Sequence, residues 1–278
     1  MPAERIAENL DFINWTVLTG LAVGTFAAVV FGRLRADATR GYLGFTALCA
    51  ALLGLLAVLS GNVLPSVVAA IDGTPDPAFA VIRQASLGAF TALAALYMVA
   101  IARGHRSPII GLAGLAAGIL ALAVAAIAWG GSAVGSVALF VQFSLIAAAT
   151  GGVLAAMILG HWYLVTPKLP EAPLVLFSRI LTAVMLAQLG LFLVAVGAGA
   201  GPSGSGGFAA LSGPWALFVW LRLVVGIIFP LIVSWAAIQT ARTRSMESAT
   251  GLLYINVGTI AAGTILASGL YFGAGILV

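Results

Sequence analysis

Charged residues are scarce in this chain of 278 residues, and acidic ones are the scarcest. Eight Asp and Glu residues stand against twelve Lys and Arg residues, so only 7% of the chain is charged, compared with about 25% in a typical soluble domain. The mean hydropathy is +1.17. A chain of this composition cannot form an ordinary water-exposed surface, which excludes a soluble enzyme, a nucleic-acid-binding module and a disordered regulator.

Cysteine and histidine are nearly absent as well. The single cysteine, Cys49, excludes an internal disulfide, a four-cysteine zinc site and a cysteine-ligated iron–sulfur cluster. The two histidines are His105, in a short basic loop, and His161, at the end of an apolar stretch. Because a b-type haem in a membrane protein commonly takes two axial histidines on facing helices, we expect neither haem nor iron–sulfur cluster nor metal ion in this chain.

Long apolar runs are what the chain has in abundance. About 20 mostly apolar residues are enough to cross the hydrocarbon core of a bilayer. Eight such stretches are present, at residues 13–32, 41–62, 80–103, 108–130, 135–164, 174–197, 214–241 and 249–274. They are continuous rather than alternating in polarity, which favours helices over barrel strands. The sequence therefore predicts an all-α polytopic membrane protein with eight transmembrane helices.

Basic residues lie in every second loop. The loops after the first, third, fifth and seventh stretches hold Arg33, Arg35, Arg40, Arg103, Arg106, Lys168, Arg242 and Arg244. The intervening loops, at 63–79, 131–134 and 198–213, contain no Lys or Arg. Because basic loops face the cytoplasm, this pattern predicts that both termini lie outside, in a membrane of the bacterial inner type.

The two halves of the sequence look related. Residues 24–32 (GTFAAVVFG) are similar to residues 152–160 (GVLAAMILG), and Arg83 and Arg222 are each followed by another arginine 20 positions later. We therefore expect two tandem four-helix units, residues 1–130 and 131–278, in the same orientation. Chance similarity is the alternative, since segments rich in Gly, Ala, Leu and Val match one another easily.

No Asp or Glu lies well inside any apolar stretch, whereas three arginines do: Arg83, Arg179 and Arg222. The missing carboxylates count against an ion-motive pump or a sodium–proton exchanger. A charge near the middle of the membrane costs about 2.5–3.5 kcal/mol, so such an arginine either faces the bundle interior or extends its side chain to the surface. Extension of the side chain to the surface suits Arg179 best, whereas Arg222, which is deepest, should face the bundle interior.

Polar side chains gather near the outer end of three stretches: Asn62, Arg83, Gln84 and Arg222. Hydrogen-bond donors at this depth suit the carbonyl or hydroxyl oxygens of a quinone or quinol headgroup, and Asn62 and Gln84 are candidate acceptors for Arg222. Secondary candidates for ligand contact are His161, Trp162, Tyr163 and Arg179. The first three are explained more simply as an interfacial belt.

The layout resembles the membrane anchor subunits of dimethyl sulfoxide and polysulfide reductases. Residues 262–273 (AGTILASGLYFG) are similar to the last helix of those anchors, and Trp220-Leu221-Arg222 is similar to a Trp-Arg pair in the same family. Where that family has a histidine near the outer end of the second span and a carboxylate near the start of the third, this chain has Ser60-Gly61-Asn62 and Arg83-Gln84.

The resemblance implies a subunit that binds menaquinol or ubiquinol on the outer side and passes electrons to an iron–sulfur partner of a catalytic subunit. The first hypothesis is thus a quinone-binding membrane anchor of a respiratory oxidoreductase, which is not an enzyme by itself. The alternative is a small-solute transporter or channel built from two parallel repeats, which Arg222 and Pro230 favour because proline breaks transporter helices. A purely structural membrane subunit is the third hypothesis.

Overall fold

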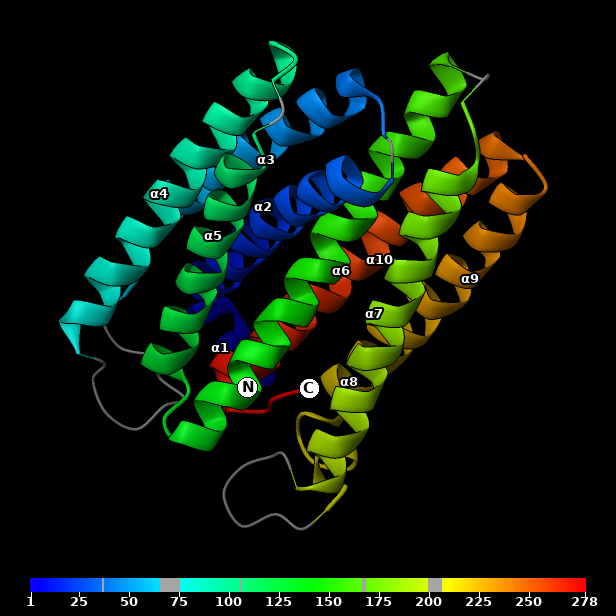
Figure 1. Ribbon diagram of the computed structural model, residues 1–278. Helices are drawn as coiled ribbons and strands as arrows, with labels where there is room; N and C mark the ends of the chain where they lie inside the picture. Colours follow the sequence, from blue (N-terminus) through cyan, green and yellow to red (C-terminus); the bar gives the residue numbers. More distant parts are fainter. Residues whose placement is uncertain (37, 66–75, 106, 167–168, 200–206) are drawn as a thin grey trace.

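A computed structural model describes residues 1–36, 38–65, 76–105, 107–166, 169–199 and 207–278. Figure 1 shows one bundle of long helices. Among the described residues, eight helices are long and apolar enough to cross a membrane, and no strand is present. The prediction of an all-α polytopic membrane protein with eight transmembrane helices is confirmed.

The spans extend slightly beyond the predicted apolar stretches at most of their ends. They are α2 (Leu10–Arg35), α3 (Arg40–Gly61), α4 (Pro77–Ala102), α5 (Pro108–Trp129), α6 (Ala133–Val165), α7 (Ala172–Gly197), a composite span Ala216–Arg242, and α10 (Met246–Ala274). The composite span consists of α8 (Ala216–Leu223), a π-helical segment η2 (Val224–Ile228) and α9 (Phe229–Arg242). Two short elements were not predicted, α1 (Pro2–Glu8) and the 3-10 turn η1 (Ala209–Leu211).

Proline and an acidic cap determine where several spans begin. Pro77, Pro108 and Pro173 stand in the first turns of α4, α5 and α7, where their missing N–H groups have no intrahelical role. Asp76 caps α4, since its carboxylate accepts a hydrogen bond of 2.8 Å from the Ala78 amide. The cap fixes the first turn of α4, just before the buried Arg83.

The two ends of the bundle differ in charge. One end, called the basic end, is formed by residues 33–40, 102–108, 165–172 and 242–246, apart from 37, 106, 167 and 168, so Arg106 and Lys168 lie outside the described residues. The opposite end, called the terminal end, is formed by residues 61–65, 76–77, 129–133 and 207–216, and both chain termini lie near it (Figure 1). The structure thus places the termini and the arginine-rich turns at opposite ends.

Corresponding helices have the same neighbours in the two halves. In the first half α2 packs on α3, α3 on α4, α4 on α5, and α5 on α2; in the second half α6, α7, the composite span and α10 repeat this order. The halves meet chiefly where α2 packs against α6, and α4 and α9 lie at opposite edges of the bundle (Figure 1). The order of helix neighbours is thus the same in the two halves.

The contact between the halves is a crossing of backbones. A Cβ atom added to Gly24 on α2 would overlap the Ala147 carbonyl of α6, and one added to Gly151 would overlap the backbone of Gly24. The next residue, Gly152, has open space where its Cβ would lie. Small residues permit this approach, and in lipid close van der Waals packing holds helices together.

The charge asymmetry gives a topology prediction. In a Cys49→Ala background, a cysteine at the exposed Ser212 of the terminal end should react in intact cells with a membrane-impermeant thiol reagent. A cysteine at the exposed Thr243 of the basic end should react only after the cells are permeabilised. The opposite labelling pattern would show that the basic end faces outward.

Candidate ligand site at the terminal end

Arg83 is buried between two tryptophans at the terminal end. It lies in the second turn of α4 and is 6% exposed. Its guanidinium carbon is 4.8 Å from the ring centroid of Trp129 at the end of α5 and 5.4 Å from that of Trp15 on α2. Each cation–π contact contributes about 0.5–2 kcal/mol, so the pair offsets part of the free energy needed to bury the charge.

The hydrogen-bonding capacity of Arg83 is unused within the described residues. It forms no ion pair there, and its Nε is buried without an acceptor. The Nε1 of Trp15 is likewise buried and unpartnered. Aromatic faces attract a cation but supply no conventional acceptor, and a guanidinium carries five N–H donors. The site therefore presents donors that no described residue satisfies.

A pocket of about 670 Å³ opens beside Arg83. It is lined by Gly61, Asn62, Leu64, Pro65, Asp76, Pro77, Ala80, Val81, Arg83, Gln84, Ala85, Ala128 and Trp129. These residues come from the end of α3, the start of α4 and the end of α5, so three helix ends form its walls. Its volume lies within the range of about 300–1,000 Å³ typical of small-molecule sites.

Gln84 positions the wall of the pocket. Its Nε2 donates to the Val58 carbonyl at 2.7 Å and to Asn62 Oδ1 at 2.9 Å, which uses both of its N–H groups. Its Oε1 is buried against Gly61, where an added Cβ would overlap it. Asn62 is thus held by its oxygen, and its Nδ2 has no acceptor among the described residues. Of the two amides, Asn62 is the one free to donate to a ligand.

Arg222 does not join this cluster, contrary to the sequence-based expectation. It is 3% exposed on α8, and its Nη2 donates to Gln188 Oε1 of α7 at 2.8 Å, while its Nη1 donates to the Gly226 carbonyl at 3.0 Å. The expected acceptors, Asn62 and Gln84, are not its partners. The reason is topological, because α8 packs on α10 and on the segments that flank it, whereas α3 and α4 belong to the other half.

The Gly226 carbonyl is free to accept because Pro230, four residues later, has no N–H to donate to it. The residues just before Pro230 form the π-helical segment η2, in which the usual i−4 pattern is interrupted. Gly226 also lies against Gly263 of α10, and a Cβ on either residue would come within 2.6 Å of the other's Cα. Backbone from two helices therefore closes around the Arg222 guanidinium.

The secondary candidates lie apart from the pocket, on the half of the bundle nearer the basic end. His161 and Arg179 are exposed, and Trp162 packs edge-on against Gly41, where a Cβ would lie 2.5 Å from its ring. Tyr163 is buried and donates to the Pro170 carbonyl. These positions suit anchoring at the membrane boundary.

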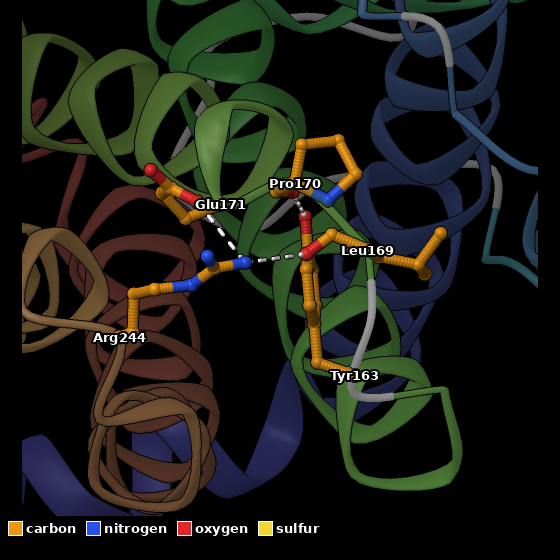
Figure 2. A network of polar contacts seen from close by, with 5 residues as sticks. All are labelled: Tyr163, Leu169, Pro170, Glu171 and Arg244. Carbon is orange, nitrogen blue, oxygen red and sulfur yellow. Dashed lines mark hydrogen bonds and ion pairs between the residues drawn. The ribbon is translucent and has the colours of Figure 1, made fainter.

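Figure 2 shows the polar network around Tyr163. Arg244 Nη2 lies 3.5 Å from Glu171 Oε2 and donates to the Leu169 carbonyl at 3.3 Å. A second pocket, of about 560 Å³, is lined by Tyr163, Leu164 and residues 244–247. Its arginine is already paired with one carboxylate and Glu247 adds another, so it offers a ligand far less unsatisfied charge than the Arg83 pocket does.

Sequence reasoning missed three members of the site. Trp15 and Trp129 stand inside apolar stretches, where an aromatic residue is an ordinary core residue and no spacing marks a cation partner. Asp76, in the loop before Pro77, lines the pocket mouth and supplies a carboxylate near the start of the third span. A helix-capping pattern of Asp before Pro could have located it.

Comparison with protein-family models, curated proteins and solved structures gives no match to this chain. The case for function consequently rests on the geometry of the site.

The arrangement around Arg222 predicts a structural role. Gln188→Leu removes the side-chain acceptor of a buried cation and should lower stability by about 1–3 kcal/mol. Adding Arg222→Leu removes the cation as well, so the double variant should recover most of that loss. Thermal unfolding in detergent compares the three proteins; a double variant less stable than Gln188→Leu alone would contradict the pairing.

Proposed function

We propose that the protein is the membrane subunit of a respiratory oxidoreductase and binds a quinone or quinol headgroup in the Arg83 pocket. The observation that carries this proposal is the buried, unpaired guanidinium of Arg83, which lines a pocket of about 670 Å³ at the terminal end. A cation in that position has donors that no described residue satisfies and that a ligand can satisfy.

The chemistry of the lining suits such a headgroup. A quinone ring is planar and carries oxygens on opposite edges, while its tail is apolar. Arg83 and Asn62 supply donors for oxygens, Trp129 supplies an aromatic surface, and Leu64, Ala80 and Val81 supply apolar walls. In small-molecule sites, a small number of polar groups in an otherwise apolar wall fixes the orientation of the ligand.

The depth of the site supports the same conclusion. Arg83 lies six residues after the first residue of α4, or roughly 9 Å along the helix at 1.5 Å per residue. This is the boundary between headgroups and hydrocarbon, where a lipid-soluble ligand can keep its tail among acyl chains and place its polar ring in the pocket. Asp76 at the pocket mouth adds a carboxylate that can hold a proton from a quinol hydroxyl.

A redox role for this subunit requires partners. The sequence has one cysteine and two histidines, too few for a four-cysteine cluster. Electrons therefore have to move between the bound ligand and an iron–sulfur protein, itself joined to a catalytic subunit. The terminal end, where the pocket opens, is the face on which we place the iron–sulfur partner.

The transporter hypothesis has one observation in its favour, the π-helical segment ahead of Pro230 in the composite span. Broken helices in transporters expose backbone groups to substrate. Here Gly226 already accepts from Arg222, and Gly263 packs against it. The freed backbone is used inside the protein, which leaves the Arg83 pocket as the better-supported ligand site.

The test measures binding of a short-chain ubiquinone and of a menaquinone analogue to the full-length chain in nanodiscs. Quenching of tryptophan fluorescence reports the binding. Arg83→Gln should weaken binding about 10- to 100-fold, because a hydrogen bond to a charged group contributes about 1.5–3 kcal/mol and 1.4 kcal/mol is tenfold. The control is Arg179→Gln, which alters an exposed arginine and should leave affinity unchanged. Equal affinities for all three proteins would rule out the Arg83 pocket.

A pair of glycine variants tests the same pocket without removing any ligand donor. Gly61→Ala forces Gln84 from its position and so releases Asn62, which should reduce quinone affinity severalfold. Gly88→Ala lies on α4 with open space at its Cβ and is the matched control. If both variants bind like the unaltered protein, the Gln84–Asn62 contact does not shape the site.

A further inference from the structure

Within the part of the chain that the structure describes, the charge of Arg83 has no counter-ion. No carboxylate of the described residues lies within ion-pair distance of it. Asp76 lines the same pocket, but its side chain is bound to the start of α4, and Asp11 lies on the exposed face of α2, one turn before Trp15. The walls contributed by α3 and α5 hold no charged residue. The pocket lining thus carries one carboxylate and one guanidinium; the carboxylate accepts from the Ala78 amide, whereas the guanidinium has no acceptor among the described residues.

Arg222 finds acceptors for both Nη atoms within the protein, although its Nε, like that of Arg83, is buried without an acceptor among the described residues. It stands six residues after the first residue of α8, as Arg83 does in α4. There Gln188 and the Gly226 carbonyl supply oxygens at 2.8 Å and 3.0 Å, and backbone closes the space. At Arg83 the corresponding space is the pocket, where a bound ligand can supply the oxygen that no described residue provides.

A guanidinium is not deprotonated in proteins, so it favours an oxygen that bears negative charge over a neutral one. In the partly buried site this preference is poorly screened by water. We infer that the Arg83 pocket selects planar aromatic ligands with an ionised ring oxygen, as in a hydroxyquinone whose hydroxyl has lost its proton. This inference rests on the proposed quinone site and specifies the charge of the ligand that fits it best.

Two naphthoquinones of nearly equal size provide the test. 2-Hydroxy-1,4-naphthoquinone is ionised at neutral pH, and 2-methyl-1,4-naphthoquinone is neutral. The full-length protein in nanodiscs should bind the ionised compound at least about tenfold more tightly, since one charge pair near a protein surface exceeds 1.4 kcal/mol. Arg83→Gln should remove this preference, Arg83→Lys should keep part of it, and Arg179→Gln should leave it intact.

The outcomes separate the two proposals. Binding of the neutral compound with equal or higher affinity in the unaltered protein overturns the inference about charge but leaves the quinone site standing, and this measurement does not depend on whether Arg83→Gln folds. A preference that persists in a folded Arg83→Gln protein also overturns it. Binding of neither compound, with an intact thermal unfolding transition, overturns the proposed function itself.

Discussion

The backbone crossing of α2 and α6 is the contact on which the rest of the bundle depends. Lipid removes the hydrophobic drive that joins helices in water, so association has to come from close packing. Gly24 and Gly151 allow the two central helices to touch through their backbones, and each half then packs around its own member of the pair. Because α2 also carries Trp15, the crossing fixes the position of one of the two tryptophan rings that enclose Arg83.

An aromatic cluster extends that constraint to the terminal end. Trp129 packs edge-on against Trp15, Phe12, Phe143 and Phe272, and its carbonyl accepts a hydrogen bond of 2.6 Å from Tyr271. Four spans, α2, α5, α6 and α10, are tied together by these contacts. A ring held from several sides keeps its face in place, which is what a cation–π contact with Arg83 requires. Among the described residues, the contacts that hold the Arg83 charge are thus the two tryptophan rings.

The sequence predicted the parts of this protein that follow from local rules. Eight apolar stretches predicted eight spans. The proximity of Asn62, Arg83 and Gln84 was also predictable, because the end of α3 and the start of α4 are joined by one loop. The separation of Arg222 was not foreseeable, because depth in the membrane says nothing about which neighbour a helix has. The two tryptophans around Arg83 and the π-helical segment were not predicted either, because both depend on packing between spans that are distant in sequence.

Arg83 and Arg222 each lie six residues after the first residue of their helix, but packing satisfies the two guanidinium groups to different extents. Around Arg222, Gly226 and Gly263 draw two helices so close that the guanidinium finds its oxygens within the protein. Around Arg83 the ends of α3, α4 and α5 line a pocket, and the small side chains of Ala80 and Ala128 lie in its wall. Both guanidinium groups are buried, with 6% of Arg83 and 3% of Arg222 exposed, so each needs interactions that offset its loss of hydration. At Arg222 the oxygens of Gln188 and Gly226 provide these interactions. At Arg83 two tryptophan rings provide part of them, and its N–H donors, which have no acceptor among the described residues, lie at a pocket.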